Sequence, residues 1–86
     1  MEQEKKSLAG QIRAGRALKG LSQKRLSELA GVSSMTVKRA EGSGKPYPSA
    51  DAVTAICHAL ESEGVEFIPE NGGGAGVRLT KANNEK

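Results

Sequence analysis

A short segment near the middle of the chain gathers side chains that suit contacts with a nucleic acid. It reads "SSMTVKR" (33–39). At about 100° per residue in a helix, Ser34, Lys38, Met35 and Arg39 fall within roughly 140° of arc. The small and apolar residues of the same segment fall on the other side. One face of a short helix therefore presents a hydroxyl, a thioether and two cations.

These groups match the edges of base pairs in the major groove of DNA. Arg39 or Lys38 can donate to guanine O6 and N7, Ser34 can donate or accept, and Met35 can pack on a thymine methyl group. Two plainer interpretations stay open, namely that the two cations are solvated charges and that Met35 fills a gap in the core. The residues that we predict to read bases are Ser33, Ser34, Met35, Lys38 and Arg39.

Two short helices must position this face. Apolar residues at helical spacing predict a helix over about 22–30, with Ser22 as its N-cap. Gly31 suits the left-handed conformation that a helix end requires. Ser33 can then cap a second helix over about 33–42. Two helices joined by a tight glycine turn form a helix-turn-helix, whose second helix enters the major groove.

The remaining segments complete one domain. A helix is expected over 7–19, and two prolines in "GSGKPYP" (42–48) exclude a helix there. A further helix runs from the N-cap Ser49, with Asp51 in its first turn, to Gly64. The alternating "VEFI" and "VRL" predict a small β-hairpin around a glycine-rich connection.

We therefore expect a mainly α fold of four to five helices with a short C-terminal β-hairpin. The expected division of the 86 residues is a flexible basic arm at 1–6, a helix-turn-helix domain at 7–64, a hairpin at 65–80 and a disordered tail at 81–86.

The charge is distributed unevenly along the chain. Residues 5–45 contain ten Lys or Arg and two Glu, a balance of +8, whereas residues 46–86 contain three basic and six acidic residues, a balance of −3. The first half is thus suited to a polyanion, although a merely lopsided solvated surface is the alternative. There is no apolar run long enough for a membrane span, and the single cysteine favours a reducing cytoplasm, where a DNA-binding protein would lie on the nucleoid.

Nothing in the sequence assembles a catalytic or metal site. Cys57 falls near an apolar helix stripe and is expected as a small core residue. His58 is the only histidine, and a metal would need three or four ligands. The stretch "NGGGAG" (71–76) lacks the following helix and the lysine of a phosphate-binding loop. We expect no enzyme activity, no cofactor and no metal.

The central segment resembles the helix-turn-helix domain of the Xre (Cro-like phage-repressor) family, over roughly residues 8–64. The matching residues are Leu21, Ser22, Gln23, Leu26, the turn Leu29-Ala30-Gly31-Val32, Ser33, Val37, Glu41 and Gly42. Two features differ from the family pattern: Ser27 stands where relatives have Ala, and the hairpin replaces a fifth, dimer-forming helix. The ending "EGVEFIPENGGGAGVRL" resembles that of other short bacterial regulators with this domain, so we expect a complete protein.

The resemblance also implies roles for individual residues. Arg16 and Glu41 are implied to form a structural pair across the domain. The family pattern also implies that Gln23 contacts a phosphate or a base. Independently of the resemblance, the charges of Lys24 and Lys45 suit phosphates, and the DNA contacts that we predict to be of phosphate or mixed type are Ser22, Gln23, Lys24, Thr36 and Lys45.

These inferences favour a transcription regulator that binds double-stranded DNA sequence-specifically. We expect a repressor or autoregulator that acts as a homodimer on a (pseudo)palindromic operator, with half-sites about one helical turn apart. The dimer or partner surface would include Val65, Phe67, Val77 and Leu79, with helix 49–64 and Leu18 nearby. The alternative is a protein-binding module of the antitoxin or anti-activator type, which would use the hairpin to hold a toxin or regulator, with or without DNA binding.

Overall fold

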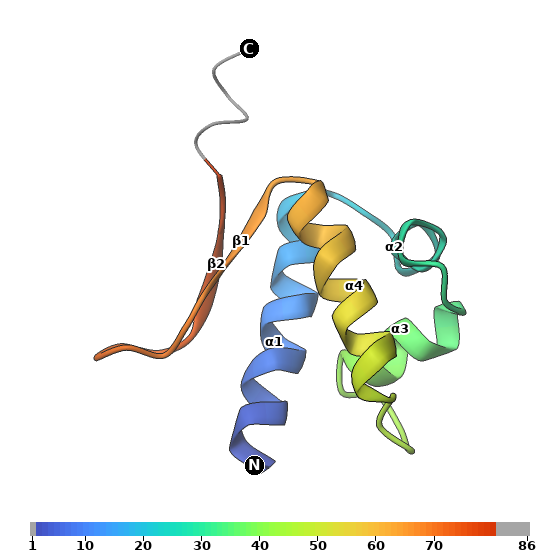
Figure 1. The fold of residues 1–86 in the computed structure, drawn as a ribbon, viewed down its shortest axis with the longest axis horizontal. Coiled ribbons are helices and arrows are strands. Elements are labelled where there is room, and N and C mark those ends of the chain that lie inside the picture. The colour runs from blue at the N-terminus through green and yellow to red at the C-terminus, as the bar shows by residue number, and fades with distance from the viewer. Residues whose placement is uncertain (1, 81–86) are drawn as a thin grey trace.

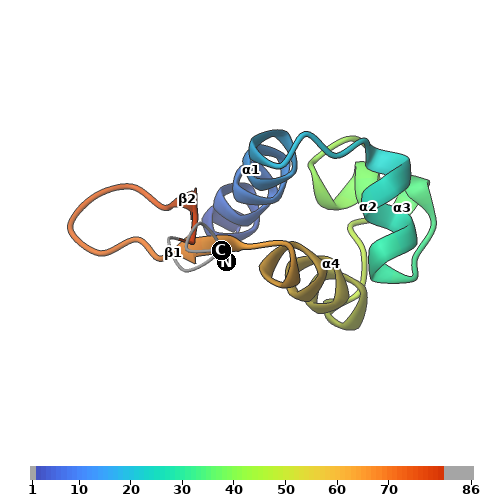
Figure 2. The same ribbon diagram turned by 90° about the horizontal axis from the view of Figure 1, so that it is seen from above.

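The computed structural model describes the backbone of residues 2–80 and the side chains of residues 8–80. The elements in chain order are α1 (Glu2–Leu18), α2 (Gln23–Ala30), α3 (Ser34–Ala40), α4 (Ala50–Ser62), β1 (Val65–Ile68) and β2 (Gly76–Leu79) (Figure 1). Helices α1 and α4 lie side by side in the middle of the molecule. Helices α2 and α3 lie on one side of them, and the hairpin lies on the other (Figure 2). The expected mainly α fold with a C-terminal hairpin is confirmed, with four helices among the described residues.

Serine hydroxyls start three of the helices. Ser22 Oγ accepts a hydrogen bond from the Arg25 backbone N–H, and the hydroxyls of Ser33 and Ser49 do the same for the third residues of α3 and α4. Each of these N–H groups would otherwise lack a helical acceptor. All three predicted N-caps are confirmed.

Gly31 ends α2 in the left-handed region, with φ of 74°. Its N–H and that of Val32 donate to carbonyls in the last turn of α2, those of Glu28 and Ser27. A residue with a Cβ would be strained at this φ, so the glycine allows the chain to turn directly into α3.

An aliphatic core joins all four helices to β1. The largest fully buried side chains are Ile12, Leu26, Ile56, Leu60, Val37 and Val65. Ser27, which replaces the expected Ala, is also buried. Its hydroxyl donates to the Lys24 carbonyl at 2.6 Å, so the extra polar group is satisfied within α2.

The ends of the chain differ from the sequence prediction. Helix α1 begins at Glu2 and not at residue 7, so residues 2–6, expected as a flexible arm, continue the helix. No proline or glycine interrupts residues 2–9, and a helix once started extends at low cost. The predicted disordered tail at 81–86 lies outside the described residues.

The hairpin pairs within one chain. Strands β1 and β2 are antiparallel, with Val65 opposite Leu79 and Phe67 opposite Val77. Opposite residues of an antiparallel pair share a face, so these four side chains lie on the face that meets α1 and α4. Val65 is only 1% exposed and belongs to the core. Its prediction as part of a dimer or partner surface is therefore wrong, because the chain's own helices already cover it.

Candidate DNA-binding surface

Helix α3 presents the predicted face to solvent. Ser34, Met35 and Lys38 are exposed and Arg39 is partly exposed, whereas Val37 is fully buried against α2 and α4. Met35 keeps 47% of its surface accessible, which is far more than a side chain filling a gap in the core would keep. The helical wheel therefore sorted these residues correctly between core and solvent.

Two of the residues predicted to contact DNA, Ser33 and Thr36, already form hydrogen bonds with each other at the start of α3. Ser33 Oγ accepts from the Thr36 backbone N–H at 3.1 Å, and the two hydroxyls lie 2.9 Å apart. A hydroxyl has several bonding positions. These two side chains thus fix the first turn of α3, on which Ser34 and Met35 are displayed.

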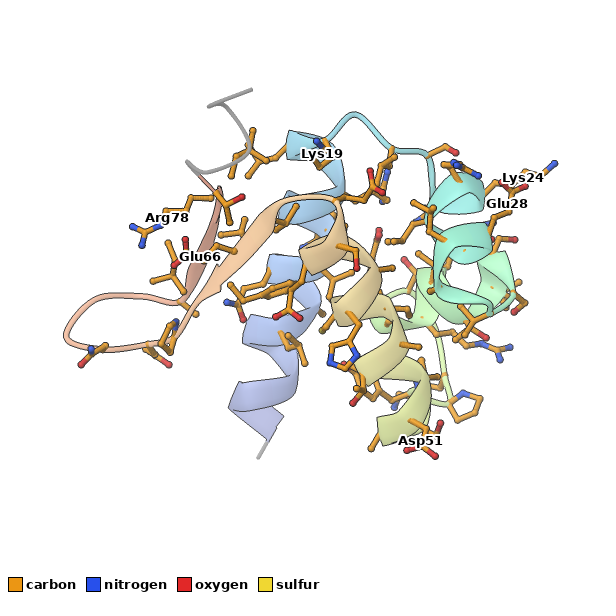
Figure 3. All side chains as sticks on the ribbon, turned by 45° about the horizontal axis from the view of Figure 1, so that its top comes forward. Lys19, Lys24, Glu28, Asp51, Glu66 and Arg78 are labelled. Carbon is orange, nitrogen blue, oxygen red and sulfur yellow. The ribbon has the colours of Figure 1, made fainter. Side chains whose placement is uncertain are left out.

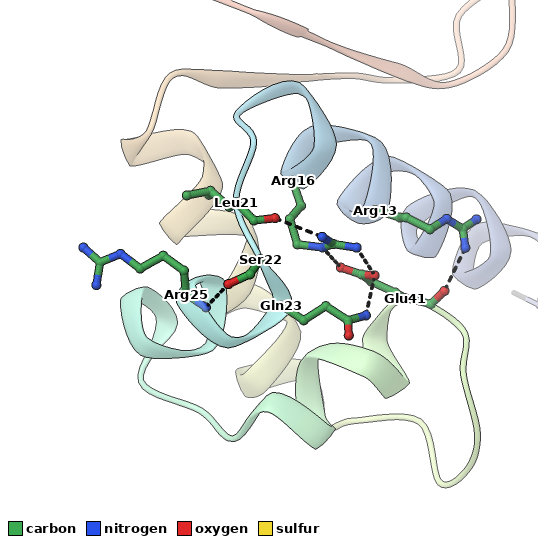
Figure 4. A network of polar contacts seen from close by, with 7 residues as sticks. All are labelled: Arg13, Arg16, Leu21, Ser22, Gln23, Arg25 and Glu41. Carbon is green, nitrogen blue, oxygen red and sulfur yellow. Dashed lines mark hydrogen bonds and ion pairs between the residues drawn. The ribbon is translucent and has the colours of Figure 1, made fainter.

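A buried carboxylate holds the helix-turn-helix unit on α1 (Figure 4). Glu41, directly after α3, is 4% exposed, and it accepts two hydrogen bonds from Arg16 of α1, at 2.7 Å and 3.1 Å. Arg16 Nη1 also donates to the Leu21 carbonyl at 2.9 Å. The hydrogen bond to Glu41 raises the pKa of the Arg16 guanidinium above its usual value. Such a two-pronged ion pair fixes the relative orientation of the two helices.

Gln23 joins the same network. Its amide nitrogen donates to Glu41 Oε1 at 3.0 Å, which ties the start of α2 to the end of α3. The sequence resemblance had placed Gln23 on DNA and had not connected it to Glu41. No local signal could have found this contact, because the two residues lie 18 positions apart.

Sequence reasoning missed two further polar contacts of α1. Arg13 Nη1 donates to the Glu41 carbonyl at 3.2 Å, so a second arginine contacts the end of α3. On the opposite face of α1, Gln11 Nε2 donates to the carbonyls of Ile68 and Gly76, at 3.1 Å and 2.9 Å. The latter pair of bonds joins α1 to both strands of the hairpin.

Two exposed lysines lie in the segments that flank α3 in the chain, Lys24 in α2 and Lys45 in the loop after α3. Lys24 extends from α2 on one side of the molecule, whereas Glu66 and Arg78 of the hairpin lie on the other side (Figure 3). Unlike these two lysines, Arg25 forms an ion pair, with its Nη1 3.2 Å from Glu28 Oε1. More than half of the Arg25 side chain remains exposed in this pair. Lys24 and Lys45 are therefore exposed cations without an ion-pair partner among the described residues, which makes them candidates for contacts with phosphates.

The described residues hold no other candidate chemistry. They contain no group of three or more His, Cys, Asp or Glu that could bind a metal ion. Cys57 packs partly against the core, and burial, followed by the charge of Glu61, raises the pKa of its thiol to about 11. The thiol is thus neutral near pH 7, which suits packing better than reactivity. Within this part of the chain no helix is both long and apolar enough to cross a membrane.

Helix α2, the Gly31 turn and α3, with its polar outer face, together define a helix-turn-helix unit, the class of fold that places a helix in the DNA major groove. The comparison with known families agrees. The family model of the helix-turn-helix domain matches residues 7–67, and the chain belongs to this family of DNA-binding domains. The matched region runs from α1 into β1. No curated protein matches the chain.

Proposed function

We propose that this protein is a sequence-specific, double-stranded DNA-binding transcription regulator of the Xre (Cro-like) type. The observation that carries the proposal is the outer face of α3, where Ser34, Met35 and Lys38 are exposed beside Arg39 on a helix fixed by Glu41. No part of this role requires a catalytic step.

The polar groups divide between two tasks. Lys38 and Arg39 lie on the face of α3 that would enter the groove, so they are assigned to base edges, with Ser34 and Met35. Lys24 and Lys45 lie outside α3 and are assigned to phosphates, which orient the protein but carry no sequence information. Ser22 and Ser33 contribute mainly by capping their helices, Thr36 by its hydrogen bonds to Ser33, and Gln23 by bonding to Glu41.

We further propose that the regulator acts as a homodimer. One helix as short as α3 reads few base pairs, and a pair of helices on a (pseudo)palindromic operator multiplies the specificity. A dimer that occupies a promoter would repress it, and repression or autoregulation is the simplest outcome of binding. The alternative of a protein-binding module acts through the hairpin, where Leu79 is 43% exposed; such a module would remain monomeric on its own.

Selection of fragmented genomic DNA by the purified protein tests the division of tasks. Two double variants that each remove two positive charges are compared, Lys38→Ala/Arg39→Ala and Lys24→Ala/Lys45→Ala. The first should lose the enriched sequence. The second should keep it but bind all sequences more weakly, with a salt dependence reduced by about 0.9 in log–log slope per lost phosphate contact. If the two variants behave alike, α3 does not read bases as proposed.

A further inference from the structure

The connection between β1 and β2 contains an asparagine followed directly by a glycine. Its segment 69–75 reads "PENGGGA", and Figure 2 shows it extending away from the four helices. Asn71 and Gly72 are both exposed. The backbone nitrogen of the residue after an asparagine can close a five-membered ring on the side-chain amide carbon. When that residue is glycine, no Cβ shields the nitrogen.

Asn71 differs from the other side-chain amides of the described residues. Gln11 donates to two backbone carbonyls of the hairpin, and Gln23 donates to the Glu41 carboxylate. Both glutamines are partly buried and would lose these bonds if their amides reacted. Asn71 is exposed, and no hydrogen bond within the described part of the chain holds its side chain. Its amide carbon is therefore open to attack.

The nitrogen that would attack is free as well. Within the described residues no backbone hydrogen bond involves Gly72, so its N–H is left to water. Gly72 has a φ of 85°, and a Cβ added at Gly72, Gly73 or Gly74 would meet no atom within 4 Å. No neighbouring group thus opposes the backbone rotation that ring closure requires.

The two ends of the loop are fixed. Ile68 pairs with Gly76 at the end of the hairpin, and Gln11 Nε2 donates to the carbonyls of both residues, at 3.1 Å and 2.9 Å. The last strand pair before the loop is thereby tied to α1. A change in the backbone at position 71 falls between these two fixed points, so we expect it to leave the strands and the helices in place.

We propose that Asn71 is a site of spontaneous deamidation, with water as the only co-reactant. The Gly72 nitrogen forms a bond to Asn71 Cγ, and Cγ loses its amide nitrogen, which takes up the Gly72 amide proton and leaves as ammonia. Water then opens the succinimide ring at either carbonyl. Opening at Cγ gives an aspartate, and opening at the backbone carbonyl gives an isoaspartate, whose chain runs through the former side chain. Neither step oxidises or reduces any atom.

The modification changes the charge of the hairpin. Each converted molecule gains one carboxylate next to Glu70, in a loop that lies on the far side of α1 and α4 from the helix-turn-helix unit (Figure 2). The reaction needs neither DNA nor a second chain, so it does not depend on the proposed regulatory function. Binding of DNA through α3 should be unchanged in the converted protein.

Incubation of the whole purified chain at neutral and at alkaline pH tests the site. Peptide mapping by mass spectrometry should locate the conversion at Asn71, and isoelectric focusing should show a new, more acidic species. Both should appear faster at alkaline pH, because the attack requires removal of the Gly72 amide proton. Asn83 and Asn84 precede an asparagine and a glutamate and lie outside the described residues, so they serve as reference sites. Conversion of either one before Asn71 overturns the proposal.

Two substitutions in the loop test the role of the glycine. Gly72→Ala should slow conversion at Asn71 about tenfold or more, a rise of ~1.4 kcal/mol in the barrier, because the new Cβ shields the attacking nitrogen. Gly73→Ala is the matched control, since it adds the same methyl group one residue further along in equally open space. It should react like the wild type. Equal rates in the two variants would contradict attack by the Gly72 nitrogen.

Protein unfolded in guanidinium chloride shows whether the fold leaves the loop open. The native protein should convert about as fast as the unfolded protein, because a loop whose opening costs almost no free energy gives no protection. A native rate lower by about tenfold or more would show that the fold restrains Asn71, and the proposed site would then be wrong.

Discussion

Among single residues, Glu41 connects the helix-turn-helix unit to α1. Its side chain is buried, its carboxylate accepts hydrogen bonds from Arg16 and Gln23, and its carbonyl accepts one from Arg13. These bonds join the start of α2 and the end of α3 to α1. The angle at which α3 is displayed is thus fixed by a residue that DNA would not contact.

Replacing this carboxylate should destabilise the protein strongly. Glu41→Gln would leave the Arg16 guanidinium, whose side chain is 20% exposed, without its counter-charge. We expect a loss of about 3 kcal/mol in the free energy of unfolding, measured by urea denaturation. The control Glu28→Gln breaks the exposed Arg25–Glu28 pair and should cost less than about 1 kcal/mol. Equal losses in the two variants would show that the buried pair contributes no more than a surface pair.

At the level of secondary-structure elements, the close packing of α1 on β1 depends on a glycine, Gly15. A Cβ added at Gly15 would lie 3.0 Å from Val65 Cγ1 and 3.6 Å from Leu60 Cδ1. Both neighbours are fully buried in the core, so an added Cβ would press on side chains that are already packed. Glycine weakens a helix interior, and here that cost allows β1 to approach α1 closely.

A pair of substitutions in α1 separates helix propensity from packing. At Gly10 the nearest atom to an added Cβ is Arg13 Nη2, at 3.9 Å, so Gly10→Ala should raise stability by about 0.5–1 kcal/mol. Gly15→Ala gains the same propensity but crowds Val65, and overpacking of a core costs about 1–3 kcal/mol. In thermal unfolding Gly15→Ala should therefore melt below the wild type and Gly10→Ala above it. If both variants gain stability, the contact between α1 and β1 is looser than the structure indicates.

In the whole molecule, the helix-turn-helix unit formed by α2 and α3 lies on one side of α1 and α4, and the hairpin lies on the other side (Figure 1). In the proposed dimer a fixed arrangement of the two subunits would set the distance between the two copies of α3.

The affinity of the proposed dimer should therefore depend on the spacing of the operator half-sites. Inserting about half a helical turn, ~5 base pairs, between the selected half-sites turns one site to the opposite face of the duplex. The wild type should then bind little better than it binds one half-site. A single half-site is the control, because a subunit that binds alone gains nothing from a second site. Titration of the wild type on native, spaced and single half-site operators measures this, and an insertion without effect would rule out a rigid dimer on DNA.

Local signals in the sequence predict the helix-turn-helix and the sorting of its faces between core and solvent. The N-caps Ser22, Ser33 and Ser49, the Gly31 turn and the exposure of Met35 and Lys38 all depend on neighbours within a few residues, and such local signals are readable along the chain. The sequence predicts the start of α1 too late, at residue 7, because residues 2–6 contain neither an N-cap serine nor an apolar stripe that would indicate a helix.

Contacts between residues that are far apart in the sequence follow from the packing of the elements and could not be predicted from local patterns. Gln23 bonds to Glu41 across 18 positions, and Gln11 bonds to Gly76 across 65. Val65 and Leu79 lie opposite each other on the same face of the hairpin, yet Val65 is buried and Leu79 is 43% exposed. The alternation of a strand predicts which of its faces is apolar, but not which of two paired strands the helices cover. The packing of α1 and α4 against the hairpin sets that coverage, and no single segment contains those contacts.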